Sequence, residues 1–389
     1  MRNKQALCTS NGERPVRRKV GIIGATGMVG RRMADLLLGH PRFELGMVVG
    51  SETRAGELYR SVWKEKESAL RRHYGEFWQE FPCPEALNQT RLSSFQDLLH
   101  SDCSIVFSSL PDRAGDLEEK LLNNGQRVFS NSPYRRFSPD VALVVPEVNG
   151  KDLGRTQLIK NPNCVSSGLL LVLAPLSAQY GIREVVVTTY QSLSGRGDAK
   201  YAAELVIGNV YPLYGSSEGT EYYIRREVGR ILGESFPVSV TCNRICVQEG
   251  HFVEVRIKTR RQVPGLSEAA EVLAGFNPLG GMHLHSSPAR PIVLLSEPGR
   301  PRPTLDAFHH GGMAIAVGNL SVEDEVFDLR LTYVVNNLVR GAAGGVLLNA
   351  ELWDAGVATH SPNAAANVAA CQDVRALLWN SLSRRNTGI

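Results

Sequence analysis

Cys164 is the residue of this sequence whose type and surroundings suggest chemistry most directly. It follows Asn-Pro-Asn in "KNPNCVSSG" and precedes "LLLVLAPL", an apolar stretch of helical length. Asn161 or Asn163 is expected to cap that helix, because the proline between them prevents an earlier start. A thiol in the first turn lies at the positive helix end, which lowers its pKa and favours the thiolate. The residues alone leave two interpretations open, a nucleophile and a small buried core residue.

A cysteine nucleophile needs a base, and the chain has nine histidines. His251 stands out, because "NRICVQEGHFVEV" places it where an alternating strand resumes after a glycine turn. Arg244 falls in the same stretch, within an apolar strand where an unpaired charge is unfavourable. An arginine there needs a carboxylate, which either an internal ion pair or a substrate can provide.

A glycine-rich turn stands near the start of the chain. In "KVGIIGATGMVGRRM", Gly24, Gly27 and Gly30 lie at three-residue spacing between an apolar run and a helical pattern. Glycines let the backbone turn tightly and approach a pyrophosphate, which then lies at the helix N-terminus. The turn therefore predicts dinucleotide binding, with a purely structural turn as the alternative.

The end of the second predicted strand, "VVGSETRAGELY", bears on which nicotinamide cofactor binds. Ser51, Thr53 and Arg54 can donate hydrogen bonds to a 2′-phosphate, and arginine can do so with two parallel bonds. Glu52 is the opposing observation, since an acidic residue at this place holds a ribose 2′-hydroxyl. The sequence favours NADP.

Strand and helix patterns alternate from Arg18 to about residue 150, which predicts a Rossmann-type, doubly wound parallel sheet of the α/β class. Residues 59–92 fit this alternation poorly and are expected to form an inserted loop or helix. After residue 150, "VVVTTYQSLSG" and "HFVEVRIKTRRQV" are long β-type stretches, which predict a second domain of α+β type. The expected division is a disordered arm over 1–17, a dinucleotide-binding domain over 18–150 completed by a C-terminal helix over 337–389, and a second domain over 151–336.

Composition excludes several classes of function. The chain has 389 residues, 43% hydrophobic and 21% charged, as is typical of a globular enzyme of two domains. A net charge of +4 is too small to indicate nucleic-acid binding, and no apolar run reaches the roughly 18 residues that a membrane-spanning helix needs. Seven scattered cysteines show no zinc-site spacing, and with no secretory signal they predict a metal-free, cytoplasmic protein.

Taken together, these motifs resemble the aspartate-β-semialdehyde dehydrogenase family, most closely its archaeal and fungal branch, over about residues 19–356. The resemblance implies that Cys164 in "KNPNC" is the nucleophile and that Gln191 in "TTYQSLSGRG" orients the acyl group. It also implies that Arg244 and His251 in "NRICVQEGH" are the substrate arginine and the acid/base histidine.

The resemblance extends to phosphate and cofactor. In "NSPYRRFSPDVALVVPEVN", Asn131 and Arg136 match the family's phosphate-loop region. The cofactor implied is NADP, with Asn337 meeting the nicotinamide. The residues expected to bind it are Gly24, Thr26, Gly27, Met28, Val29, Gly30, Ser51, Thr53, Arg54, Ser194, Gly195 and Asn337.

Several positions depart from the family pattern. The family's substrate helix carries a glutamate followed three residues later by a lysine, whereas this chain has "YGSSEGTEYYIRREVGRILG". Glu218 and Glu221 both fit the glutamate, and no lysine follows either. Arg196 stands where the family prefers a small residue and is a candidate for the missing cation. The family's cofactor arginine lies one position earlier, where this chain has Thr53 beside Arg54.

The function implied by the resemblance is reductive dephosphorylation of L-aspartyl-4-phosphate to L-aspartate 4-semialdehyde through a cysteine thioester. This step leads towards lysine, methionine and threonine. The resemblance also implies a homodimer or tetramer assembled through the second domain. Because the substrate helix is altered, two alternatives stay open: a reductase of another acyl phosphate or of a malonyl or succinyl thioester, and an inactive dinucleotide-binding paralogue.

Overall fold

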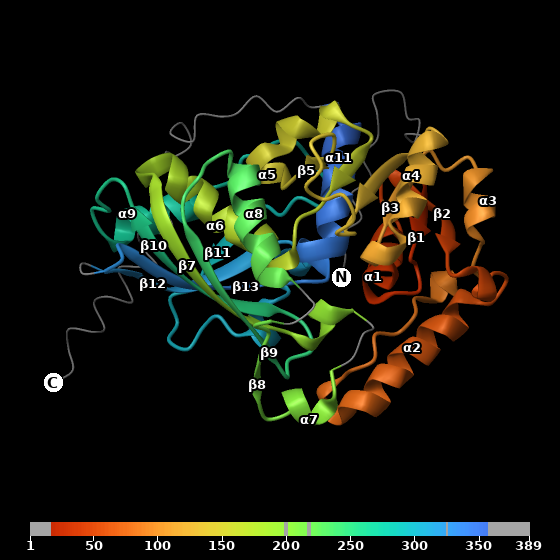
Figure 1. Cartoon of the computed structure of the whole chain (residues 1–389), viewed down its shortest axis with the longest axis horizontal. Coiled ribbons are helices and arrows are strands. Elements are labelled where there is room, and N and C mark those ends of the chain that lie inside the picture. The colour runs from red at the N-terminus through yellow and green to blue at the C-terminus, as the bar shows by residue number, and fades with distance from the viewer. Residues whose placement is uncertain (1–16, 198–200, 216–218, 324–325, 357–389) are drawn as a thin grey trace.

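The computed structural model of the chain describes residues 17–197, 201–215, 219–323 and 326–356, and it contains two sheets side by side (Figure 1). The expected N-terminal arm, Glu218 and the C-terminal segment from residue 357 on lie outside the described residues, apart from the arm's last residue. No helix within the described part of the chain is long and apolar enough to cross a membrane.

The first sheet has six parallel strands in the order β2-β1-β3-β4-β6-β5. Its strands are β1 (Arg18–Ile23), β2 (Phe43–Val49), β3 (Ile105–Ser108), β4 (Arg127–Ser130), β5 (Ala142–Leu143) and β6 (Leu158–Lys160). The sheet thus continues beyond the boundary expected at residue 150. Its helices are α1 (Met28–Leu37), α2 (Tyr59–Tyr74), α3 (Phe95–Leu99), α4 (Asp116–Asn123), α5 (Pro146–Asn149) and α11 (Gly344–Asp354).

Alternate strand residues face opposite sides of this sheet, and each side has its own core. Val20 and Ile22 pack with residues of α1, α2 and α11. Ile23 and Val106 pack with residues of α3 and α4 on the other side. Helices on both faces of a parallel sheet make a doubly wound fold, as the sequence predicts.

The poorly patterned residues after position 59 begin with the long helix α2, which Figure 1 shows along the lower edge of the first domain, reaching towards α7. Tyr59, Trp63 and Leu70 form its buried side. Glu67 on the same side accepts a 2.8 Å bond from Arg31 of α1, and the same carboxylate accepts from Trp78 Nε1 at 3.1 Å and the Phe81 N–H at 3.0 Å. One buried carboxylate therefore joins α1, α2 and the segment after α2.

The second sheet is mixed, with seven strands in the order β11-β12-β13-β10-β7-β9-β8, as expected for an α+β domain. Its strands are β7 (Ile182–Gln191), β8 (Val210–Pro212), β9 (Val238–Ile245), β10 (His251–Thr259), β11 (Ile292–Leu294), β12 (Ile315–Val322) and β13 (Leu329–Val335). Its helices are α6 (Cys164–Tyr180), α7 (Ala203–Val206), α8 (Thr220–Leu232), α9 (Leu266–Ala274) and α10 (Pro303–Asp306).

Strand register brings the predicted functional residues of this domain to one end of the sheet. Gln191 at the end of parallel β7 lies opposite Arg244 near the end of β9. His251, the first residue of antiparallel β10, lies opposite Val335, the last residue of β13. Asn337 is the second residue after β13, ahead of a short π-helical stretch over Val339–Ala343.

The buried carboxylate of Glu67 gives a prediction about stability. Glu67→Gln removes the negative charge of the carboxylate that bonds the buried guanidinium of Arg31, so the free energy of unfolding should fall by about 3 kcal/mol. Glu65→Gln is the matched control on the same helix, because its ion pair is exposed and should contribute less than about 1 kcal/mol. Urea unfolding followed by tryptophan fluorescence measures both, and equal losses would contradict the prediction.

Candidate active site

Cys164 is the first residue of α6, and its thiol faces a histidine. The helix is capped by Asn163, one of the two expected caps, whose Oδ1 accepts from the Val165 N–H at 2.9 Å. The Sγ of Cys164 lies 3.1 Å from Nε2 of His251, although the two residues are far apart in the sequence. At this distance the imidazole can hydrogen-bond the sulfur and stabilise negative charge on it.

The other ring nitrogen of His251 fixes the tautomer. The backbone N–H of Ser192 points at Nδ1 from 3.0 Å, so Nδ1 must accept a hydrogen bond. The Ser192 hydroxyl is also 3.0 Å from Nδ1, but its proton goes to Oδ1 of Asn337 at 3.0 Å. A neutral His251 therefore carries its proton on Nε2, on the side of Cys164.

Asn337 holds together the loops that surround the histidine. Besides the Ser192 hydroxyl, its Oδ1 accepts from the N–H of Gly250, the residue before His251, at 3.0 Å. Its Nδ2 donates to Oγ of Ser194 at 2.9 Å. The amide group thus fixes the segment after β7, the start of β10 and the segment after β13 relative to one another.

Arg244 lies beside the pair formed by Cys164 and His251. Its side chain is fully buried, and Nη1 donates to the Ser192 carbonyl at 2.7 Å. Gly195 passes so close that a Cβ there would stand 2.5 Å from this Nη1 and 3.0 Å from Nε2 of His251. Only glycine fits between the two side chains without displacing one of them.

The environment of Cys164 corrects the expectation of a thiolate. Burial raises the pKa of the Cys164 thiol to about 11, which outweighs the opposing effects of the Arg244 charge and the N–H groups at the helix start. Burial, followed by the Arg244 charge, also holds the pKa of His251 well below its usual value. Both shifts favour the neutral forms, so the ligand-free site contains a thiol and an imidazole.

A second cluster joins the nucleophile turn to the phosphate-loop region. Both carboxylate oxygens of Glu227 in α8 accept from the Asn163 N–H, at 3.0 and 2.9 Å, and Oε1 also accepts from Nη1 of Arg136 at 2.9 Å. Arg136 donates through Nη2 to the Asn131 carbonyl at 2.6 Å. The Nδ2 of Asn131 and the Nε of Arg136 are buried with no hydrogen-bond partner among the described residues. Unsatisfied buried donors of this kind suit an anionic ligand.

The glycine turn has the geometry of a dinucleotide site. Gly24 has a φ of +72°, and a Cβ there would stand 2.6 Å from the Ser109 carbonyl oxygen. No side chain caps α1, whose N-cap is Gly27 and whose first turn has no acidic residue. The N–H groups at the start of α1 are therefore available to a pyrophosphate, so the residues present fit a dinucleotide.

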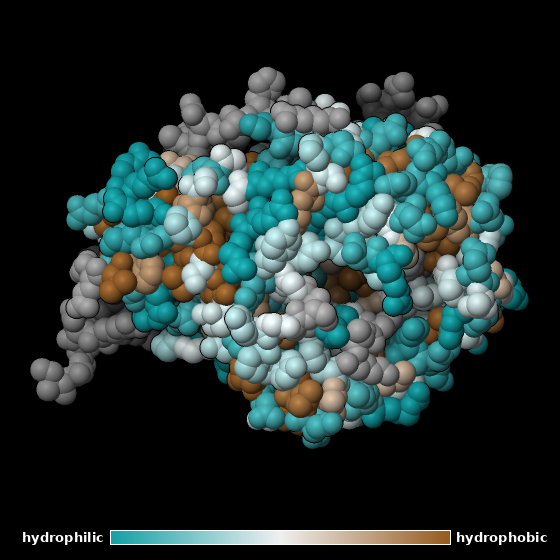
Figure 2. All heavy atoms as spheres, in the orientation of Figure 1, coloured by the Kyte–Doolittle hydropathy of each residue, from teal (hydrophilic) through white to brown (hydrophobic). Residues whose placement is uncertain are grey.

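A cleft between the two domains is lined by the first residue of α1 and by the segment after β7, and Figure 2 shows a recess near the middle of this face of the molecule. Its lining includes two of the expected cofactor residues, and its members are Met28, Arg32, Glu67, Trp78, Phe81, Ser194, Gln248, Glu249 and Leu338.

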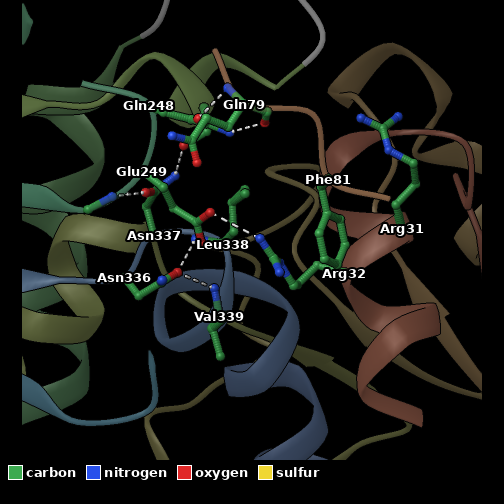
Figure 3. Close-up of polar contacts among 12 residues, drawn as sticks. Arg31, Arg32, Gln79, Phe81, Gln248, Glu249, Asn336, Asn337, Leu338 and Val339 are labelled. Atoms are coloured by element: carbon green, nitrogen blue, oxygen red, sulfur yellow. Dashed lines mark hydrogen bonds and ion pairs between the residues drawn. The ribbon is translucent and has the colours of Figure 1, made fainter. Parts of the chain in front are cut away.

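Two polar contacts join the two domains at the cleft, one from α1 and one from the segment after α2 (Figure 3). Arg32 Nη2 bonds Oε2 of Glu249 at 3.0 Å. Gln248 accepts from the Gln79 N–H at 2.9 Å and donates to the Gln79 carbonyl at 2.8 Å. The first domain and the segment after α2 thus both contact the residues that precede His251.

Other predicted residues have partners elsewhere. Gln191 is buried and donates to Oγ1 of Thr189 at 3.1 Å, and Oε1 of Glu221 accepts from the Cys242 N–H at 3.2 Å. Glu218, the other candidate for the substrate glutamate, lies outside the described residues.

At the end of β2, the hydroxyls of Ser51 and Thr53 lie 3.0 Å apart. Glu52 accepts from the N–H of Phe95 at the start of α3, at 3.1 Å, so its carboxylate is engaged there. Arg54 forms a bidentate ion pair with Glu65. Of the remaining glycine-turn residues, Thr26 accepts from Nη1 of Arg31 through its carbonyl. Within the described part of the chain, no three His, Cys, Asp or Glu residues are grouped so that they could hold a metal ion.

Three residues of the site were not identified from the sequence. Ser192 gives no signal, because its contacts with His251 and Asn337 depend on the tertiary fold. Glu227 does give a signal in the sequence. It lies between Ile224 and Val228 on the apolar side of α8, where a carboxylate needs a partner. Glu249 lies two residues before His251, but its partner Arg32 is on the other domain.

A dinucleotide-binding sheet beside a domain that carries a cysteine–histidine pair is the arrangement of nicotinamide-dependent dehydrogenases that work through a cysteine. Residues 19–156 match the family model of the semialdehyde dehydrogenase NAD binding domain, and residues 173–340 match that of the semialdehyde dehydrogenase dimerisation domain.

Whole-chain relatives carry one name. The aspartate-semialdehyde dehydrogenase of Methanothermobacter thermautotrophicus is 35% identical over 358 residues, covering 86% of this chain and 98% of that protein. That of Trichophyton rubrum is 32% identical, covering 87% and 97%. A crystal structure of aspartate semialdehyde dehydrogenase with NADP from Candida albicans has a TM-score of 0.74 at 26% identity, covering 87% of this chain and 99% of that one. This chain belongs to the aspartate-semialdehyde dehydrogenase family, which confirms the resemblance found in its sequence.

The raised pKa of Cys164 gives a prediction about its reactivity. Iodoacetamide should alkylate Cys164 with a pH midpoint near 11 in the ligand-free protein, because the thiolate is the reactive form. Arg244→Met should move the midpoint upward, since the arginine's charge lowers this pKa. Peptide mass spectrometry resolves Cys164 from the other cysteines. A midpoint below the ordinary thiol value of about 8.5 would show that the helix end prevails over burial.

Proposed function

We propose that this protein is an NADP-dependent aspartate-semialdehyde dehydrogenase, which converts L-aspartyl-4-phosphate to L-aspartate 4-semialdehyde and phosphate. The observation that carries the proposal is the 3.1 Å contact between Sγ of Cys164 and Nε2 of His251, beside Ser194 at the edge of the interdomain cleft. When bound, NADPH supplies the hydride. The turn of Gly24, Gly27 and Gly30 would hold its pyrophosphate and Asn337 would meet its nicotinamide, with the other predicted residues of the turn and of the segment after β7 contributing to the same site.

The thiol of Cys164 attacks the acyl carbon and expels phosphate, which takes up the thiol proton, and a thioester is left on the sulfur. Hydride addition then turns the thioester into a thiohemiacetal, and loss of the sulfur releases the aldehyde. The Nε2 N–H of His251 stabilises the negative charge that develops on the attacking sulfur. Its proton goes to the oxygen that gains charge on hydride addition and returns to Nε2 as the thiohemiacetal collapses, and the departing sulfur takes a proton from solvent. The contacts of Nδ1 with Ser192 support this role, because they keep the ring oriented.

The phosphate group is assigned to Asn131 and Arg136. Support comes from their two unpartnered buried donors, and from Glu227, which bonds both Arg136 and the residue before Cys164. Glu227 therefore positions the proposed phosphate-binding residues relative to the turn that carries Cys164. Gln191 orients the acyl group, and it reaches this position at the end of β7 opposite Arg244.

The substrate carboxylate is assigned to Arg244, with Arg196 as a second cation. Both guanidinium groups lie against the ring of Tyr201, at 5.3 and 4.8 Å from its centroid. The hydroxyl of Tyr201 is buried without a hydrogen-bond partner among the described residues, and it can donate to the same ligand. Glu221 and Glu218 stay candidates for the substrate ammonium.

Assembly and location follow from the family. The match to a dimerisation domain supports a homo-oligomer, and a homodimer or tetramer assembled through the second domain is proposed. A cytoplasmic location and a place in lysine, methionine and threonine synthesis belong to the same proposal.

The reaction is tested in the reverse direction. Aspartate semialdehyde and inorganic phosphate should drive reduction of NADP, measured by absorbance at the nicotinamide band, and omission of phosphate should abolish the rate. Malonyl and succinyl thioesters with NADPH form the comparison. A higher kcat/KM with either thioester would replace the proposed substrate, and intact NADPH binding without any turnover would identify an inactive paralogue.

The nucleophile is tested by substitution. Cys164→Ala should abolish turnover and leave NADPH affinity nearly unchanged, because the thiol forms the covalent intermediate whereas the cofactor binds mainly to the other domain. Steady-state kinetics and NADPH fluorescence titration measure the two effects. A variant that kept more than about a hundredth of the activity would remove Cys164 from the mechanism.

The substrate arginine has its own test. Arg244→Lys should raise KM for aspartate semialdehyde strongly, since an ammonium cannot form the two parallel bonds of a guanidinium to a carboxylate. KM for phosphate should change much less, because that anion is assigned to Arg136. An unchanged KM for the aldehyde would limit Arg244 to an internal role.

A further inference from the structure

The arginine expected to hold a cofactor 2′-phosphate is already bound by a carboxylate of the inserted helix α2. Arg54 donates from Nη1 to Oε2 of Glu65 at 2.9 Å and from Nη2 to Oε1 at 2.8 Å. Oε2 of Glu57 lies 3.5 Å from Nη1 as well. Both outer nitrogens of the guanidinium are thus used by Glu65, in the parallel geometry that a phosphate would also use.

This ion pair lies beside the dinucleotide turn. The N–H of Ala25 donates to the Val49 carbonyl at 3.1 Å, which holds the end of β2 against the turn. Tyr59, the first residue of α2, donates its hydroxyl proton to the Ala25 carbonyl at 2.6 Å. The start of α2 and the segment that carries Arg54 therefore flank the same turn, where an adenine ribose would lie.

The backbone of Glu65 is fixed, whereas its side chain is accessible. Two residues further along α2, Glu67 is buried in its ion pair with Arg31, so the helix cannot move away as a whole. The side chains of Arg54 and Glu65 are 29% and 54% exposed. Exposed pairs of this kind open readily, so a ligand with a stronger charge can take the guanidinium.

We propose that Glu65 competes with the 2′-phosphate of the cofactor for Arg54 and so limits the preference for NADP over NAD. This inference rests on the proposed use of NADP. A phosphate that takes the two outer nitrogens must displace the carboxylate, so the ion pair between Arg54 and Glu65 opposes its binding. The competition concerns Arg54 alone. The hydroxyls of Ser51 and Thr53 lie 3.0 Å from each other and hydrogen-bond each other instead of Glu65.

Binding of two nucleotides that differ only in the 2′-phosphate tests the inference. Adenosine 2′,5′-bisphosphate and AMP are titrated into the full-length protein by calorimetry at low salt. Glu65→Gln should tighten binding of the bisphosphate by about three- to tenfold and leave AMP unchanged, because the competing charge is lost and the exposed pair is weak. The gain should shrink as salt is raised, since screening weakens exposed charges.

The gain in bisphosphate affinity of Glu65→Gln should require Arg54. Arg54→Ala should weaken the bisphosphate alone, and the double variant Arg54→Ala/Glu65→Gln should bind like Arg54→Ala. Glu44→Gln is the control for net charge: Glu44 lies near the start of β2 and pairs with Arg17 at 3.2 Å. It should leave both affinities unchanged.

Two results would overturn the inference. Unchanged bisphosphate affinity in Glu65→Gln would show that the pair does not compete, and weaker affinity would show that Glu65 orders Arg54 for the phosphate. Both are read from binding alone. A protein that fails to turn over aspartate semialdehyde, yet shows the gain, would contradict the proposed reaction and leave this inference standing.

Discussion

The amide of Asn337 is the contact on which the rest of the site depends. Three chain segments meet there: the turn after β7, the residue before β10 and the residues after β13. Because β7, β10 and β13 are hydrogen-bonded neighbours, their ends are already close, and one side-chain amide suffices to fix the loops. The orientation of His251 follows, since Ser192 contacts both Asn337 and the imidazole.

Buried carboxylates serve a similar purpose at larger separations. Glu227 joins α8 to the turn before Cys164 and to Arg136, and Glu67 joins α1 to α2 and to the wall of the cleft. In each case an arginine and backbone or side-chain N–H groups satisfy the carboxylate, which keeps the burial of its charge tolerable. Glu227 shows the remaining cost, since burial raises its pKa despite the charge of Arg136.

Much of the fold could be read from the sequence, because the patterns involved are local. The glycine turn, the alternation of strands and helices and the cap at Asn163 each depend on a few neighbouring residues, and the family resemblance supplied the pairing of Cys164 with His251. The raised pKa of Cys164 could not be read in this way. A helix start is visible in the sequence, whereas burial is a property of everything packed around the thiol.

The same limit applies to charge partners. The sequence predicts Arg54 as a donor to the cofactor, but its partner Glu65 belongs to the inserted helix, whose place against the strands the sequence does not show. The sequence also leaves Glu52 open as a ligand of the ribose, and in the structure Glu52 accepts from the N–H of Phe95. The interaction partners of side chains at a strand end can be predicted only when the element that packs against them is known as well.

Arg244 links the pKa values of Cys164 and His251 to the binding of a substrate carboxylate. Its charge lowers the pKa of both Cys164 and His251, and it acts on two groups that burial already keeps neutral. A carboxylate placed on Arg244 offsets that charge, so the pKa of the imidazole rises and proton uptake becomes easier at the stage when a substrate is present. The thiol pKa rises too, so the sulfur cannot rest as a stable thiolate. It then gains negative character as the bond to carbon forms, with the Nε2 proton of His251 3.1 Å away to balance it. A thiol of high pKa makes a strong nucleophile once ionised. In the ligand-free site the sulfur stays a neutral thiol, which is a weak nucleophile.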